Sequence, residues 1–153
     1  MNLVSLLTRI HAAPEMVVIV VTGGGAQAIA DLLAVPGASK TVLEALVPYS
    51  ERSLTEFLGQ TPNQAVSIET AAAMAKTAYQ RATFLRETAA VPVIGLSCTA
   101  TLATDRPKKG DHRAHIGRCS ANDTRVLSLT LQKGARDRRA EEQVVSKLLI
   151  ATF

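Results

Sequence analysis

The 153-residue chain carries a formal net charge of +4 and is 47% hydrophobic, which fits one globular domain over residues 1–153. The charge suits a phosphate-bearing ligand but falls short of the clustered charge of nucleic-acid-binding domains. Two cysteines, Cys98 and Cys119, form no Cys-x-x-Cys motif, so neither a disulfide framework nor a metal centre is indicated. No apolar run is long enough to cross a membrane and no signal-peptide pattern is present, so we expect a cytoplasmic protein.

The first part of the chain predicts a helix, a strand and a second helix. Leucine and isoleucine recur at helical spacing over Asn2–Ala12. The apolar run Met16–Val21 predicts a buried strand, and a second helical stripe ends at Val35. Between strand and helix lies Gly23–Gly25, whose backbone freedom and nearness to free helix N–H groups suit an anion such as phosphate. The same glycines also suit a tight turn between two packed elements.

The middle of the chain alternates strands and helices. Thr41–Val47 predicts a strand and Ser50–Leu58 a short helix. The longest predicted helix begins at the N-cap Ser67, and its alanines should let it lie close to the sheet. Val91–Ser97 predicts a third strand, apolar on both faces as in the middle of a covered sheet. The longest irregular stretch follows, over Thr99–Asp111.

Two alternating segments and a final helix complete the chain. Arg113–Cys119 and Arg125–Leu131 predict an antiparallel hairpin at one edge of the sheet, and Arg136–Ile150 predicts a helix with a charged first half. The order of elements predicts an α/β fold, a three-layer α/β/α sandwich. Its sheet should be mixed and mostly parallel, with a C-terminal antiparallel hairpin.

A second candidate site follows the third predicted strand, where cations gather beside hydroxyl groups. Such donors hold a phosphate and a ribose well, and ligands bind after central strands in open α/β sheets. The alternative is a solvent-exposed loop whose charged side chains are hydrated and bind no ligand. The residues concerned are Ser97, Thr99, Thr101, Arg106, Lys108, Lys109, His112, Arg113 and His115.

Three residues, Thr22, Tyr49 and His112, are candidates for catalysis. Thr22 has no base that the sequence can place nearby, which favours a loop hydroxyl bonded to the backbone. Tyr49, in a strand-to-helix turn, suits either a ligand contact or the core. His112 follows Asp111, but neighbours on a strand point to opposite faces, which argues against an acid–base pair. Cys98 would react only as a thiolate.

Five short segments match one family pattern in order and spacing over nearly the whole chain. They are Thr22-Gly23-Gly24, Val35-Pro36-Gly37-Ala38-Ser39, Val47-Pro48-Tyr49-Ser50, Leu58-Gly59 and Val66-Ser67-x-Glu69-x-Ala71-x-x-Met74-Ala75. Together they resemble the C-terminal domain of the competence/damage-inducible protein CinA, the nicotinamide mononucleotide deamidase family. The resemblance implies a compact α/β/α domain, commonly oligomeric, that in active members hydrolyses the carboxamide of nicotinamide mononucleotide to an acid and ammonia.

The chain departs from this family at the residues that carry the reaction. The resemblance places the family's serine nucleophile, in Ala-Glu-Ser-x-Thr-Gly-Gly, at Val20, or at Val21 after a shift of one residue. It places the lysine base, in Tyr-Ser-Asn-x-x-Lys, at Leu54. Neither valine nor leucine can act as a nucleophile or base. The family's glycine-rich loop ending in Lys-Pro-x-Gly is replaced here by Cys98–Arg113.

We therefore expect a domain that binds a pyridine nucleotide or related phosphorylated small molecule without the deamidase serine and lysine. One alternative is a nicotinamide-nucleotide amidohydrolase using rearranged groups such as Thr22, Tyr49, Ser97 or His112. Another is an oligomerisation or regulatory domain for a nucleotidyltransferase partner; the resemblance also implies a homo-oligomer. Cofactors, metals, membranes and nucleic acids are not expected. The predicted ligand-binding residues are Gly23, Gly24, Gly25, Tyr49, Ser50, Ser97, Thr99, Thr101, Arg106, Lys108 and Arg113.

Overall fold

The computed structural model describes residues 2–153, which form one five-stranded sheet in the order β2-β1-β3-β4-β5. The strands are β1 (Met16–Thr22), β2 (Val42–Leu46), β3 (Val93–Thr101), β4 (His112–Cys119) and β5 (Thr124–Leu131). β1 pairs in parallel with β2 and β3, whereas β3, β4 and β5 form an antiparallel meander. The predicted hairpin at the sheet edge is confirmed.

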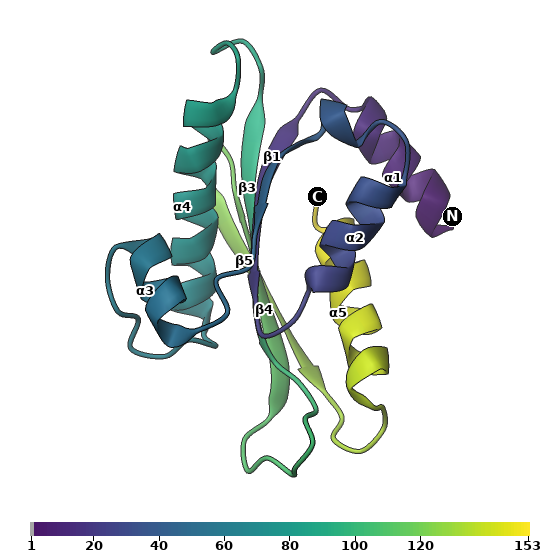
Figure 1. The fold of residues 1–153 in the computed structure, drawn as a ribbon, viewed down its shortest axis with the longest axis vertical. Coiled ribbons are helices and arrows are strands. Elements are labelled where there is room, and N and C mark those ends of the chain that lie inside the picture. Colours follow the sequence, from purple (N-terminus) through teal and green to yellow (C-terminus); the bar gives the residue numbers. More distant parts are fainter. Residues whose placement is uncertain (1) are drawn as a thin grey trace.

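Helices cover both faces of the sheet (Figure 1). The helices are α1 (Leu3–Ala12), α2 (Ala26–Ala34), α3 (Glu51–Leu58), α4 (Ile68–Leu85) and α5 (Arg138–Ala151), with a 3-10 turn at Ala38–Lys40. α1, α2 and α5 lie on one face, and α3 and α4 on the other. Two apolar cores result, one on each side. The three-layer α/β/α architecture with a mixed sheet is therefore confirmed. Within residues 2–153, no helix has the length and apolar character needed to span a bilayer.

Polar side chains cap the starts of α1, α3, α4 and α5, whereas α2 begins after Gly25 without a side-chain cap. Asn2, Ser50, Ser67 and Asp137 each accept a hydrogen bond from the backbone N–H three residues further on. Each satisfies one of the free N–H groups at a helix N-terminus. The prediction for Ser67 is confirmed, whereas Ser50, which was expected within the helix, is its cap.

β3 is longer than the sequence predicts and takes in part of the expected irregular stretch. It continues four residues beyond Ser97, to Thr101. This extension pairs with β1 as far as Thr99 and with β4 throughout, so it is paired on both sides up to Thr99 and with β4 alone at Ala100 and Thr101. The irregular segment is accordingly residues 102–111, and His112 already belongs to β4.

α4 packs directly against the backbone of the sheet, as its alanines predict. A side chain at Gly95 of β3 would overlap the carbonyl oxygen of Ala75 in α4. Ala71, Ala75 and Ala78 are fully buried at this contact. The close approach matters for the site because it orders the segment that leads into α4 against the ends of β3 and β4.

Candidate functional site

The candidate site lies at the carboxyl ends of β1 and β3, which are neighbours in the sheet. Thr22, at the end of β1, is opposite Thr99, and β3 runs on to Thr101. The glycine loop, Gly23–Gly25, follows β1, and residues 102–111, which we call the basic segment, follow β3, so the fold brings the two predicted sites together. Loops at the carboxyl ends of parallel strands are the usual place for ligands in α/β proteins.

The glycine loop is occupied by side chains of α5. The N–H of Gly25 donates to both carboxylate oxygens of Glu142, at 2.9 and 3.0 Å. The N–H of Ala28 donates to Ser146 Oγ at 3.1 Å, and that hydroxyl donates to Glu142 Oε2 at 2.6 Å. A helix N-terminus attracts an anion, and here the anion is the chain's own carboxylate. A phosphate at these amides would have to displace Glu142.

Gly23 closes the turn and packs the loop against β3. Its φ of 76° is in the left-handed region, and a Cβ there would lie 1.9 Å from the carbonyl oxygen of Ala100. The loop therefore needs glycine at this position for close packing as well as for its turn. These contacts support the interpretation of the loop as a tight turn between packed elements.

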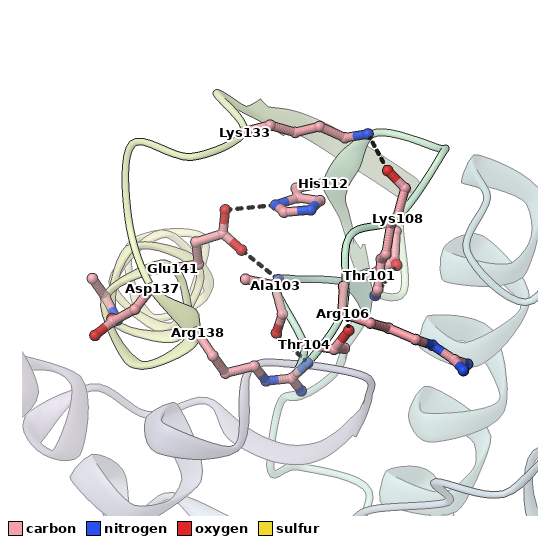
Figure 2. A network of polar contacts seen from close by, with 11 residues as sticks. Thr101, Ala103, Thr104, Arg106, Lys108, His112, Lys133, Asp137, Arg138 and Glu141 are labelled. Carbon is pink, nitrogen blue, oxygen red and sulfur yellow. Dashed lines mark hydrogen bonds and ion pairs between the residues drawn. The ribbon is translucent and has the colours of Figure 1, made fainter.

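Arg138 crosses from α5 to the ends of both strands. Its guanidinium donates to the carbonyl oxygens of Gly23, at 2.8 Å, and Ala103, at 3.3 Å. It also reaches the hydroxyl of Tyr49 at 3.5 Å. Figure 2 shows Arg138 beside Ala103 and below the basic segment. All three partners are neutral, so the positive charge of Arg138 is positioned but not neutralised.

A pocket of ≈ 320 Å³ has Tyr49 in its lining. It is lined by Thr22, Tyr49, Ser50, Glu51, Leu54, Pro62, Asn63 and Ala65. The predicted residues Thr22, Tyr49 and Ser50 thus share one pocket, and Leu54 lies in its wall. Tyr49 is 63% exposed, so its ring presents an open aromatic face rather than a core contact.

The basic segment brings further cations to the same edge (Figure 2). Lys108 Nζ donates to Thr101 Oγ1 at 2.7 Å. Burial lowers the pKa of Lys108, Arg138 and Arg106 lower it further, and Glu141 acts in the opposite direction. Among residues 2–153, no carboxylate forms an ion pair with Arg106, Lys108 or Arg138. We call these three residues the cation cluster; it can hold an anion without breaking an existing ion pair.

Three other predicted ligand-binding residues are engaged in packing. Ser97 Oγ donates to the carbonyl oxygen of Ala71 at 2.7 Å, and Thr99 Oγ1 donates to that of Ala65 at 2.6 Å. Arg113 donates to the carbonyl oxygen of Val66 at 3.0 Å. They fix α4 and the segment before it to the sheet, and the structure does not bring them to the cation cluster. Cys98 is also buried; burial and then Glu142 raise the pKa of its thiol.

His112 pairs with a residue that the sequence did not single out. Its Nδ1 lies 2.9 Å from Glu141 Oε2, and the N–H of Ala103 donates to Glu141 Oε1 at 2.7 Å. Asp111, the neighbour considered in the sequence, is exposed. Sequence reasoning missed Arg138, Glu141 and Glu142; the signal was charged residues at helical i, i+3 and i+4 spacing in the first turns of α5.

Comparison with known proteins identifies the family. The family model of the CinA C-terminal domain matches residues 17–148, so the chain belongs to this family. A search of curated proteins found no match.

Solved structures show the same fold. A competence/damage-inducible protein from Agrobacterium tumefaciens is similar with a TM-score of 0.76 and 19% identity, covering 98% of this chain and 92% of that one. A CinA superfamily protein from Enterobacter cloacae has a TM-score of 0.79 and 14% identity, covering 99% and 90%. One from Klebsiella pneumoniae 700603 has a TM-score of 0.78 and 13% identity, covering 99% and 95%.

The positions that the family resemblance assigns to the deamidase serine and lysine are apolar and buried. Val20 and Val21 lie in β1 with at most 1% of their surface exposed. Leu54, in α3, is 3% exposed. Side chains of this kind pack the two cores and offer no hydroxyl or amine to the pocket.

Proposed function

We propose that this domain binds a phosphorylated small molecule of the pyridine-nucleotide class. The observation that carries the proposal is the cation cluster, Arg106, Lys108 and Arg138, which lacks a carboxylate partner and adjoins the pocket at Tyr49. The phosphate would contact the cation cluster, and the nucleoside would lie in the pocket against the exposed ring of Tyr49.

Electrostatics supports an anion at the cation cluster. Lys108 has a lowered pKa because it is partly buried and because Arg138 and Arg106 repel its charge. A bound phosphate removes this repulsion by placing negative charge between the cations. The guanidinium of Arg138 is already held by two carbonyl oxygens, so less conformational entropy is lost when it binds a ligand.

Binding is favoured over amide hydrolysis for a chemical reason. The family's nucleophile and base would fall on Val20 or Val21 and on Leu54, which cannot transfer protons or attack a carbonyl. Loss of either member of such a pair costs several orders of magnitude in rate. The family relationship contributes the nucleotide class, and the changed residues remove the support for deamidation.

The test is calorimetric titration of the protein with nicotinamide mononucleotide and, separately, with nicotinamide riboside, which lacks the phosphate. Ammonia release is followed in the same samples. We expect the mononucleotide to bind roughly ten- to a hundredfold more tightly, because a charge-assisted hydrogen bond contributes about 1.5–3 kcal/mol. Equal affinities, or no binding of either compound, would overturn the proposal. Ammonia release above that of a buffer control would overturn the preference for binding over hydrolysis.

A further inference from the structure

His112 and Glu141 form a buried pair with a defined orientation. Glu141 is fully buried and His112 is 8% exposed. Glu141 Oε1 is taken by the N–H of Ala103, and Oε2 lies 2.9 Å from His112 Nδ1. Because a carboxylate accepts hydrogen bonds, the imidazole proton lies on Nδ1. When the ring carries this single proton, its lone pair is therefore on Nε2.

The Nε2 atom of His112 keeps a small solvent contact, although the residue as a whole is only 8% exposed. It makes no hydrogen bond within residues 2–153, and no side-chain nitrogen or oxygen among these residues is both buried and unpartnered. The ring is thus packed and oriented by Glu141, and Nε2 is the ring nitrogen that has no partner within residues 2–153. His11 differs, because its Nδ1 contacts Thr41 Oγ1 and its Nε2 contacts the carbonyl oxygen of Leu32.

Two lysines lie near this pair, Lys133 and Lys108. Lys133 donates to the carbonyl oxygens of Lys108 and Lys109, which fixes the basic segment beside the ring. Figure 2 shows His112 between Glu141 and the Lys108 segment, with Lys133 along its outer side. Lys108 is close enough to Glu141 for the carboxylate to act on its pKa. An oriented nitrogen nucleophile therefore lies in the same network as the cation cluster.

We propose that His112 is a phosphoryl-acceptor site, modified on Nε2 by a small acyl phosphate or phosphoanhydride donor. This inference rests on the proposed function, because the cation cluster that binds the nucleotide phosphate would also hold the donor. It goes beyond that function because a covalent bond forms on a residue outside the pocket.

The proposed step balances without a further reactant. The Nε2 lone pair forms a bond to phosphorus, and the bond from phosphorus to the donor's bridging oxygen breaks. The leaving group departs as a stable anion, such as acetate from acetyl phosphate, and takes that electron pair. The ring keeps its Nδ1 proton and becomes cationic, and the hydrogen bond to Glu141 stabilises this charge.

The experiment incubates the full chain with acetyl phosphate and follows the intact mass, with peptide mapping under alkaline conditions that preserve phosphohistidine. We expect one phosphoryl group on His112, lost on brief acid treatment. Glu141→Gln should slow the modification about tenfold, because a neutral hydrogen bond stabilises the cationic ring less than a charge-assisted one. Lys108→Met should slow it by a similar factor.

His115→Asn is the matched control. His115 lies on the same strand, but its Nδ1 contacts Ser128 Oγ rather than a carboxylate. Burial and the charge of Arg113 lower its pKa, which favours the neutral ring that can react with the donor. Modification should be unchanged in His115→Asn and absent in His112→Asn. Circular dichroism and the melting temperature establish that each variant is folded.

The outcomes separate this inference from the proposed function. An unmodified wild-type chain, or modification spread equally over His112 and His115, overturns the inference. So does a Glu141→Gln variant that is folded and reacts at the wild-type rate. If nicotinamide mononucleotide binds and His112 stays unmodified, the inference alone fails. If His112 is modified and Lys108→Met reacts more slowly while no nucleotide binds, the proposed function fails and the acceptor role stands.

Discussion

Two regions at the same sheet edge, the glycine loop and the cation cluster, both carry groups that attract anions, but they differ in what occupies them. The glycine loop is filled from within, because Glu142 binds the amide of Gly25 with both carboxylate oxygens. In the cation cluster, Lys108 donates to Thr101 and Arg138 to neutral oxygens, so within residues 2–153 neither forms an ion pair, and the only carboxylate that acts on Lys108 is the more distant Glu141.

The difference shows that a glycine-rich strand–loop–helix pattern is not by itself a ligand site. The helix N-terminus supplies N–H groups, but whether they face a ligand depends on residues far away in the sequence. Here α5 supplies the partners, and the same helix extends Arg138 toward the open region. Helix α5 therefore occupies the amides of the glycine loop with Glu142 and contributes Arg138 to the cation cluster.

The largest expected effect is the loss of folding in Gly23→Ala. The added Cβ would lie 1.9 Å from the carbonyl oxygen of Ala100, and the left-handed φ would be strained. We expect a loss of at least about 4 kcal/mol in the free energy of unfolding, measured by urea denaturation. Gly110→Ala, where nothing lies within 4 Å, should change it by less than about 0.5 kcal/mol. A stable Gly23→Ala protein would show that the loop is less tightly packed than described.

The next largest effect concerns Arg138→Met, which keeps the aliphatic stem of the side chain but removes the charge. Affinity for nicotinamide mononucleotide should fall roughly ten- to a hundredfold in calorimetry, since about 1.5–3 kcal/mol of charge-assisted bonding is lost. Arg139→Met is the control, because Arg139 is adjacent on α5 and lies at a different surface, beside Gln27 and Gln143. Equal affinities in the two variants would show that Arg138 does not contact the ligand.

Glu142→Gln should lower the stability of the fold and leave the affinity for the ligand nearly unchanged. One amide oxygen replaces the two carboxylate oxygens on the Gly25 N–H, and the negative charge at the start of α2 is lost. The free energy of unfolding should fall by about 1–2 kcal/mol in urea denaturation. Affinity for the mononucleotide should stay within about twofold of the wild type, because the ligand does not use these amides. A large gain in affinity would mean that Glu142 competes with the ligand.

The smallest effect is a pH dependence of binding. The pKa of Lys108 is lowered, so this side chain loses its charge at a lower pH than an ordinary lysine. Affinity should therefore decrease as the pH rises through that lowered pKa, by less than about tenfold between pH 7.5 and 10. Lys108→Arg keeps its charge over this range and should show a smaller decrease. An identical pH dependence in both proteins would indicate that Lys108 does not contact the ligand.

The fold was predictable because its signals are local. Buried strands, helical stripes and caps such as Ser67 follow from side-chain periodicity and short-range hydrogen bonds. The C-terminal end of β3 was not predictable from the sequence, because Cys98 to Thr101 become a strand through pairing with β1 and β4. Ser97 and Thr99 suited ligand donors in the sequence, but in the fold Ser97 donates to α4 and Thr99 to the segment before it.

The site was only half predictable for a related reason. Thr22, Tyr49 and Lys108 lie close to turns that the sequence reveals. The partner of Gly25 is 117 residues away, and the partner of His112 is 29 residues away. Such contacts depend on the rotation of α5 about its axis, which its periodicity constrains only by placing charged residues on one face.

The central claim is that the ligand phosphate binds at the cation cluster and not at the glycine loop. The most direct measurement is a titration of ¹⁵N-labelled protein with nicotinamide mononucleotide, followed through the backbone amide resonances. We predict that Tyr49, Thr101 and Lys108 shift with a common saturation curve while Gly25 and Gln27 stay in place. Large shifts at Gly25 and Gln27 without a response at Lys108 would contradict the account.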